Sequence, residues 1–341
     1  ILNHANELGI GFSIMASIGN KADISSNDIL EYLKDDPQTD LILMYLENFG
    51  NPRNFTRIAR EVSMIKPIVA VKSGRTQLGA KAASSHTGSL AGADIAYGAA
   101  FKRSGIIRAD TFEALFDYAT AFAMQPLPKG NHVAIITNAG GPGIMAADAV
   151  EQSGLKIQPL AGSAATALRK KLPAAASVGN PIDVLGDADP DRYVTAVEAA
   201  QDDDSIDAII VILTPQAMTK PAETARAITA CSTGGKPILA SFMGGEDVMP
   251  GREELVAANL PDYPAPERAV AALRALCDYA AWLRKPLRVL THFPVNRRRV
   301  ERVINSHVRT GQIKIVEPYA KAILRAYDFN VPPGQVASDV E

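Results

Sequence analysis

Two stretches of the chain share one layout, and this repetition restricts the fold more than any other feature. One begins at Asp40 with the apolar run LILMYL and leads to a second apolar run, IVAV, which Lys66-Pro67 introduces. The other begins at Asp207 with AIIVIL and leads to ILASF, which Lys236-Pro237 introduces. Continuous apolar runs of this length are typical of strands covered on both faces, and the residues between them fit a helix. Strand, helix and strand at this spacing predict two βαβ units with parallel sheets.

The similarity continues upstream of both units. Residues 1–10 and 144–155 each have the pattern of a helix that ends at a glycine before a new strand. In the second half this helix follows the strand pattern His132-VAIITN and the glycine turn Ala139-GGPG, neither of which has a counterpart in the first half. Three elements in the same order favour a duplication, and a chance likeness of generic βαβ units is the alternative.

The chain therefore divides into three expected parts. Residues 1–127 and 128–285 are predicted to form two doubly wound α/β domains, joined by the Pro- and Gly-containing linker Gln125-PLPKG. Residues 286–341 are predicted to be a helical connector that leads into a further domain. Since Ile1 lies within a helical pattern and no stop signal follows the last turn, we expect both ends to be cut.

The amino-acid composition argues against several classes of protein. The 341 residues include 35 Lys and Arg against 37 Asp and Glu, a balance that gives no support for a nucleic-acid partner. Two cysteines exclude a disulfide scaffold or a four-thiolate metal site and suit a reducing compartment. No apolar run reaches the roughly 18 residues that span a bilayer, and no signal segment opens the chain. We expect a cytoplasmic protein with no membrane partner.

The segment from Lys72 to Gly92 follows a predicted strand and contains one histidine, His86, among Gly, Ala and Ser residues. Small neighbours leave an imidazole ring accessible and let backbone N–H groups approach a charged ligand. His86 can therefore be a nucleophile or a base, or it can be an ordinary surface histidine. No second His or Cys lies at metal-ligand spacing, so no metal site is predicted.

A carboxylate, Glu47, ends the first predicted strand. Ligands bind at the carboxyl ends of strands in parallel sheets. A carboxylate there can hold the Nδ1–H of a histidine and leave Nε2 free to react. The alternative is a solvated side chain at the start of a loop.

The glycine turn before the helix at residues 144–155 is a candidate anion site. The amino end of a helix offers unpaired N–H groups to a phosphate. The run Gly141-PGIMA also fits a dinucleotide-binding pattern, but no acidic residue for a ribose follows the next strand near Lys156, so nucleotide cofactor binding is not favoured. A further stretch, Asn180-PIDVLGDAD, holds Asp183 and Asp187, which are either Mg²⁺ ligands or turn-forming residues.

Together these stretches resemble one family, the NDP-forming acyl-CoA synthetases related to succinyl-CoA synthetase and ADP-forming acetyl-CoA synthetase. The resembling motifs are GFSIMASIGNKADI, DLILMYLE, KPIVAVKSGRT, SSHTGSLAG, AIITNAGGPGIMAADA and GNPIDVLGDA. The resemblance implies two flavodoxin-like, succinyl-CoA-ligase-like domains followed by the start of an ATP-grasp domain. The chain would then be a central fragment, without the CoA-binding domain and most of the ATP-grasp domain.

The resemblance also assigns roles to residues. It implies that His86 is phosphorylated and that Glu47 orients it. The other residues implied at the site are phosphate-binding Asn138, Gly140, Gly141, Gly143, Ser85 and Thr87, and substrate-binding Asn20, Lys21, Asn180 and Asp183.

The implied reaction is acyl-CoA + NDP + phosphate ⇌ acid + CoA + NTP, through an acyl phosphate and a phosphohistidine. CoA, ATP or ADP, and Mg²⁺ would be bound mainly outside this chain, and a homodimer is expected. Two alternatives stay open: the acyl-CoA-sensing part of a protein lysine acetyltransferase, and a non-catalytic acyl-CoA-binding module.

Overall fold

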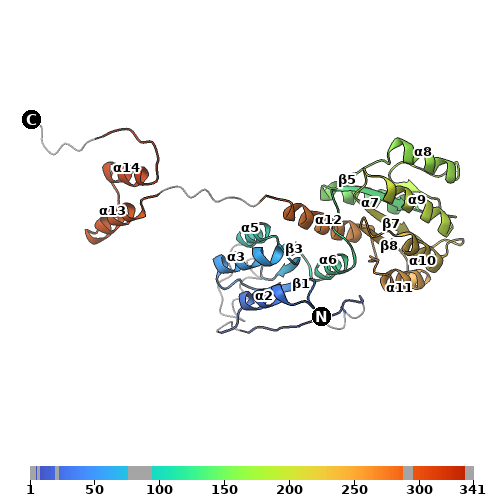
Figure 1. Cartoon of the computed structure of the whole chain (residues 1–341), viewed down its shortest axis with the longest axis horizontal. Coiled ribbons are helices and arrows are strands. Elements are labelled where there is room, and N and C mark those ends of the chain that lie inside the picture. Colours follow the sequence, from blue (N-terminus) through green and yellow to red (C-terminus); the bar gives the residue numbers. More distant parts are fainter. Residues whose placement is uncertain (1–4, 6–7, 20–22, 76–93, 287–294, 335–341) are drawn as a thin grey trace, which may run out of the picture. The chain divides into compact units, whose positions relative to one another are not determined.

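The computed structural model describes residues 5, 8–19, 23–75, 94–286 and 295–334 (Figure 1). They form two compact units, Ile1–Lys285 and Pro286–Glu341. The first unit contains two parallel sheets with helices on their faces, so the predicted α/β class is confirmed. No described helix is long and apolar enough to cross a membrane.

The first sheet has the strand order β1-β2-β3, and all of its pairs are parallel. Its elements are α2 (Ser26–Asp35), β1 (Ile42–Leu46), α3 (Pro52–Ser63), β2 (Ile68–Lys72), α5 (Asp94–Ser104), β3 (Ile107–Ala109) and α6 (Phe112–Met124). Polar caps set the helix starts: Ser25 forms a capping box with Asp28 before α2, and Asn51 accepts two backbone N–H bonds before α3. The two apolar runs of the first repeat thus become the paired strands β1 and β2.

The second sheet has the order β5-β4-β7-β8, with β6 also paired to β4. Its strands are β4 (His132–Thr137), β5 (Lys156–Ile157), β6 (Ile182–Asp183), β7 (Ala208–Leu213) and β8 (Ile238–Phe242). The helices between and after them are α7 (Gly140–Ser153), α8 (Gly162–Lys171), α9 (Pro190–Asp202), α10 (Pro221–Cys231), the 3₁₀ turn η1 (Glu246–Val248), α11 (Met249–Ala257) and α12 (Pro266–Leu283). The strands of the second repeat, β7 and β8, are therefore also adjacent and parallel.

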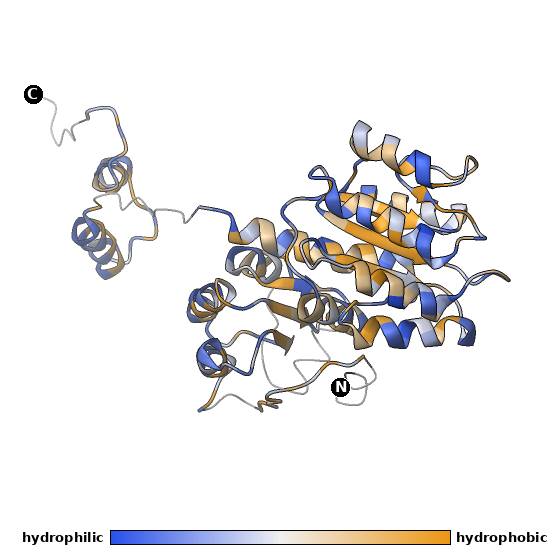
Figure 2. Cartoon of the chain, turned by 45° about the vertical axis from the view of Figure 1, so that its right-hand side comes forward, coloured by the Kyte–Doolittle hydropathy of each residue, from blue (hydrophilic) through white to orange (hydrophobic). Residues whose placement is uncertain are grey.

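Strand β7 is buried along its whole length, because helices cover both faces of the second sheet. One face packs against α8, α9 and α10, and the other packs against α7 and α12. Figure 2 shows the apolar strands of this sheet lying between helices with more polar outer surfaces. Cover on both faces explains why these strands have no polar alternation in the sequence.

Helix α7 begins earlier than the sequence analysis predicted. The glycines expected in a turn are the first residues of the helix itself, and Ala139 is the N-cap. The amide of Gly143 already donates to the carbonyl of Ala139 at 3.2 Å. Glycine therefore occupies helical positions here, close to the end of β4.

Side-chain contacts tie the two sheets of the first unit together. Arg268 of α12 donates to both carboxylate oxygens of Asp117 in α6, at 2.7 and 2.6 Å. Tyr279 of α12 donates to the carbonyl of Ser63 at the end of α3 at 2.8 Å. The linker is also held, because Gln125 bonds to the backbone of Ile238 and Asn259. The division at residues 127 and 128 stays a proposal within this compact unit.

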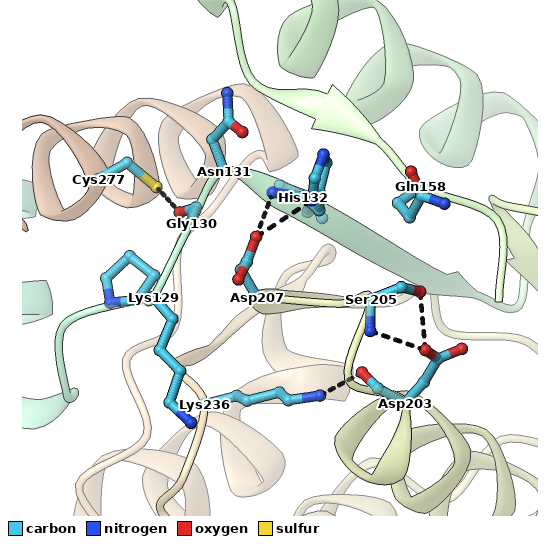
Figure 3. Close-up of polar contacts among 12 residues, drawn as sticks. Lys129, Gly130, Asn131, His132, Gln158, Asp203, Ser205, Asp207, Lys236 and Cys277 are labelled. Atoms are coloured by element: carbon cyan, nitrogen blue, oxygen red, sulfur yellow. Dashed lines mark hydrogen bonds and ion pairs between the residues drawn. The ribbon is translucent and has the colours of Figure 1, made fainter. Parts of the chain in front are cut away.

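The linker enters the second sheet at its amino edge (Figure 3). Asp207, at the start of β7, accepts the backbone N–H of His132 at 2.9 Å, and its carboxylate lies 3.4 Å from the His132 Nδ1. A Cβ atom at Gly130 would lie only 2.2 Å from the Asp207 Oδ2. The linker can pass this close to Asp207 because residue 130 is a glycine.

The second unit contains α13 (Arg297–Arg309) and α14 (Glu317–Ala326), which pack against each other. Asn296 caps α13 with its side chain, and its backbone N–H donates to the carbonyl of Ala326 at 2.9 Å. The ring centroids of His307 and Tyr319 lie 4.8 Å apart, in an edge-to-face arrangement. These two helices agree with the helical character predicted for residues 286–341.

Candidate functional site

The carboxyl edge of the first sheet carries charged residues at successive strand ends. Glu47 directly follows β1, Lys72 is the last residue of β2, and Asp110 directly follows β3. Because the three strands are parallel and adjacent, their ends meet at one edge. Glu47 therefore lies at the carboxyl edge of the sheet, where the sequence analysis expected it.

Lys72 is buried, with 3% of its surface exposed, beside Glu47. Burial is the main cause that lowers its pKa and Arg108 adds to the shift, while Asp94 and Glu47 oppose it. The ammonium lies 4.6 Å from the centre of the Tyr97 ring and donates to the carbonyl of Ser73. A buried cation with carboxylates nearby marks a candidate binding site for an anion.

The sequence analysis did not select Lys72 as a site residue. A usable signal was present, because a lysine ends an otherwise apolar strand. A cation at the end of a buried strand lies at the ligand-binding edge of a parallel sheet, where its charge can act.

Five of the predicted site residues lie outside the described residues: His86, Ser85, Thr87, Asn20 and Lys21. The residues that flank the sequence around His86 are described, and both lie near the carboxyl edge of the first sheet. Arg75 follows β2, and Asp94 is the first residue of α5. The roles of the five residues stay predictions.

A second candidate site is the amino end of α7, at the carboxyl end of β4. The N-cap Ala139 makes no side-chain hydrogen bond to the helix. The first-turn N–H groups of Gly140 and Gly141 have no partner within the helix, and Pro142 has no N–H. A Cβ atom at Gly140 or Gly141 would meet nothing within 4 Å. Both glycines are exposed at the positive end of the helix dipole, and their two free backbone donors there suit an anion.

Gly143 has a different role from the two glycines before it. A Cβ atom there would lie 2.9 Å from the Cγ2 of Thr137, at the end of β4. The absence of a side chain lets the first turn of α7 lie directly on the strand. Gly143 thus places the donors of Gly140 and Gly141 at the edge of the sheet.

Asn138 links β4 to β7 through its side chain. Its Nδ2 donates to the carbonyl of Thr214 at 2.9 Å, and its Oδ1 accepts the Thr214 N–H at 2.8 Å. Asn138 is only 2% exposed. The side chain is committed to Thr214, so a contribution of Asn138 to phosphate binding would come from its backbone.

Asn180 fills the gap between β5 and β6 along one edge of β4. Its Oδ1 accepts the N–H of Ile135 at 2.9 Å, and its Nδ2 donates to the carbonyls of Val133 at 2.7 Å and Gln158 at 2.8 Å. The side chain thereby replaces ladder bonds that neither short strand makes. This geometry gives Asn180 a structural role, and its predicted contact with substrate stays a prediction.

Asp183 and Asp187 come after Asn180 in the chain, in β6 and in the loop that follows it. Asp183 pairs with Thr137 in the sheet, and its Oδ1 accepts the N–H of Leu185 at 2.8 Å. Asp187 pairs with Arg192 at 2.7 Å, and this hydrogen bond lowers the pKa of the Asp187 carboxyl. Within the described part of the chain, no group of three His, Cys, Asp or Glu side chains could hold a metal ion.

Two family models match the chain. The succinyl-CoA ligase like flavodoxin domain matches residues 1–122, and the ligase-CoA domain matches residues 133–286. The models together cover both sheets of the first unit.

Several curated proteins are similar to this chain. The ADP-forming acetate–CoA ligase I of Archaeoglobus fulgidus is 37% identical over 342 residues, which cover 100% of this chain and 49% of that protein. The ADP-forming acetate–CoA ligase of Methanocaldococcus jannaschii is 45% identical over 285 residues, which cover 82% of this chain and 40% of that protein. The chain spans about half the length of the curated relatives it matches.

A solved structure is also similar. The dinucleotide forming acetyl-coenzyme A synthetase 1 of Ca. Korarchaeum cryptofilum, in complex with phosphate and ADP, is 36% identical to this chain with a TM-score of 0.80. The match covers 84% of this chain and 64% of that one. Sequence and structure therefore agree on the same group of relatives.

Proposed function

Because this chain belongs to the NDP-forming acyl-CoA synthetase family, we propose that its protein converts acyl-CoA, NDP and phosphate to the free acid, CoA and NTP. One observation supports the proposal that this chain performs the phosphotransfer step. The sequence segment with His86 follows β2, whose last residue, Lys72, lies beside Glu47 at the carboxyl edge of the sheet.

The reaction divides into three balanced steps. Phosphate displaces CoA from the acyl group and forms an acyl phosphate. The Nε2 of His86 attacks its phosphorus, and the carboxylic acid leaves as the carboxylate. The terminal phosphate oxygen of the NDP then attacks the phosphohistidine, which forms NTP and returns the free histidine. Glu47 would hold the Nδ1–H and stabilise the cationic ring as it forms.

The chain also offers groups suited to the transferred phosphoryl group, which carries close to two negative charges. The N–H groups of Gly140 and Gly141 can hydrogen-bond such an anion, and the dipole of α7 favours it. The Lys72 ammonium adds a cation at the other sheet. Mg²⁺ would neutralise the nucleotide phosphates, but the described residues do not fit a site for it.

Radioactive labelling tests the proposal in the complete protein that contains this chain. Incubation with [γ-³²P]ATP should give a protein label that is stable in alkali and lost in acid, as a phosphohistidine is, and His86→Asn should abolish it. Acetyl-CoA, ADP and phosphate should then yield ATP. Binding of acyl-CoA with neither label nor ATP would instead support the acyl-CoA-sensing part of a lysine acetyltransferase or a non-catalytic module.

Three further points belong to the same proposal. Residues 1–341 alone should not synthesise acyl-CoA, since the curated relatives are about twice as long. Robust turnover by this chain alone would contradict that expectation. A homodimer and a cytoplasmic location are also proposed, and light scattering and cell fractionation test them.

A further inference from the structure

We propose that four charged side chains, Arg75, Asp94, Arg108 and Asp110, form a clamp that positions the chain segment carrying His86. The inference rests on the proposed function, since it assigns positioning residues to the phosphorylated histidine. The clamp itself is built entirely from described residues.

Each arginine of the clamp contacts both aspartates. The Arg108 Nη2 lies 2.8 Å from the Oδ1 and 2.9 Å from the Oδ2 of Asp94, and the Arg108 Nε lies 3.5 Å from the Oδ1 of Asp110. The Arg75 Nη1 lies 2.9 Å from the Oδ1 of Asp110, and the Arg75 Nε lies 3.9 Å from the Oδ2 of Asp94. Charges of opposite sign therefore alternate around a closed ring.

The ring joins three elements at the carboxyl edge of the first sheet. Arg75 comes three residues after the end of β2, Arg108 lies in the middle of β3, and Asp110 follows β3. Asp94 is the first residue of α5. The clamp therefore joins the described residues on either side of residues 76–93, the stretch of sequence that includes His86.

The two halves of the clamp differ in strength. The side chains of Arg108 and Asp94 are 21% and 30% exposed, and one nitrogen contacts both carboxylate oxygens. Arg75 and Asp110 are more exposed, at 39% and 69%, so solvent weakens their pairing. Asp94 also places a negative charge in the first turn of α5, which stabilises the helix start. The Arg108–Asp94 pair is therefore the part whose loss should matter most.

The clamp is connected electrostatically to the candidate site. Asp94 raises and Arg108 lowers the pKa of Lys72, and Glu47 raises it as well. Both members of the Arg108–Asp94 pair therefore act electrostatically on the same buried ammonium as Glu47. Holding both ends of the His86 segment at this edge reduces the freedom that the histidine loses when it reacts.

A purely structural role is the alternative, and rate measurements separate the two. Asp94→Asn removes a charge with little change in shape, and Arg108→Gln removes both the charge and the guanidinium nitrogen that contacts Asp94. We expect either change to slow single-turnover labelling of His86 by [γ-³²P]ATP about tenfold or more, with unchanged nucleotide affinity and a melting temperature within about 2 °C of the wild type. Asp94→Glu should recover part of the rate.

The matched control is Arg57→Gln in α3, which breaks an exposed ion pair with Glu61 at 2.9 Å in the same sheet layer. This variant should label at the wild-type rate. The clamp would be overturned if both Asp94→Asn and Arg108→Gln were labelled at the wild-type rate. It would also be overturned if the lower labelling rates were fully explained by a smaller fraction of folded protein.

A second readout does not depend on the proposed function. Asp94→Asn should increase the rate of tryptic cleavage after Lys81, between the two ends held by the clamp, while Arg57→Gln should not. If the wild-type protein were not labelled, but Asp94→Asn were still cleaved faster than the wild type, the proposed function would be refuted and the clamp supported. Equal cleavage rates in Asp94→Asn and the wild type would overturn the clamp, whatever the labelling result.

Discussion

Lys66 and Lys236 make the same contacts in the two halves of the chain. Each ammonium donates to two main-chain carbonyls three residues apart, at the end of the helix before the first strand of its repeat. The acceptors are Leu33 and Asp36 for Lys66, and Ala200 and Asp203 for Lys236. Figure 3 shows the bond from Lys236 to Asp203, which is 2.6 Å long. The shared Lys-Pro sequence therefore reflects a shared contact, which supports the duplication.

Loss of this contact should destabilise the second sheet. Lys236→Met keeps the length of the side chain but leaves two carbonyls without a charged donor, so we expect the free energy of unfolding to fall by about 1–3 kcal/mol. Urea titration measures the change. Lys66→Met should act in the same direction. The control Lys220→Met removes only an exposed ion pair with Glu223, and a loss as small as in this control would contradict the prediction.

Glu47→Gln should slow phosphorylation of His86 and leave the fold intact. The amide can still accept a hydrogen bond, but it has no charge to stabilise the ring cation. By analogy with loss of a triad carboxylate, the rate could fall by up to about 10⁴-fold, and we expect a smaller effect. Rapid-quench labelling measures the rate, with Glu61→Gln on α3 as the control. An unchanged rate would place Glu47 outside the site.

Lys72→Met should reduce labelling of His86 more than it reduces stability. Removal of a buried ammonium relieves its desolvation, which offsets the lost attraction to Glu47 and Asp94. The anion that forms at this edge would lose a buried cation. Labelling rates and urea titrations of the same samples test this, and a large loss of stability with a normal rate would show that Lys72 is only structural.

Substitutions at two glycines of α7 should distinguish a loss of anion binding from a loss of packing. Gly141→Val places a branched side chain in the open space before the free N–H groups, so we expect a large loss of activity and a stability change of about 1 kcal/mol or less. Gly143→Ala places a methyl group against Thr137, which should cost about 1–3 kcal/mol of stability. Thermal unfolding and ATP synthesis would be measured on both. The reverse pattern would remove the anion site from α7.

Asp262 should make stability depend on pH. Burial raises the pKa of this carboxyl to about 7, although the N–H of Phe242 and the guanidinium of Arg252 favour its charged form. An unfolded aspartate titrates near pH 4, so between about pH 4 and 7 the folded state binds the extra proton. Stability should therefore fall as the pH rises through this interval, by at most about 1.4 kcal/mol per pH unit.

Asp262→Asn removes this titration and still accepts the N–H of Phe242, so the variant should lose that part of the pH dependence. Urea titrations at intervals between pH 4.5 and 7.5 would show it. The same slope in the variant and the wild type would mean that Asp262 ionises normally.

The sequence by itself determined the strands and the class of the fold. The apolar runs after Asp40 and Asp207 predicted β1 and β7. The expectation of cover on both faces holds for β7, which is buried at every position. It was wrong for β1, because Tyr45 in that strand is 59% exposed. The sequence also pointed to Glu47 and to the glycines before Ile144, since strand ends and helix starts are local features. Their roles, like that of His86, stay predictions.

Only the tertiary structure decided which side chains meet. Asn138 and Asn180 have ordinary loop compositions around them, but the order β5-β4-β7 commits their amides to Thr214 and to the backbone of β4. Likewise, Arg75 and Asp110 are 35 residues apart, and the pairing of β2 with β3 brings them within 2.9 Å. A side chain's partners depend on the register of strands distant in sequence, which no local pattern contains.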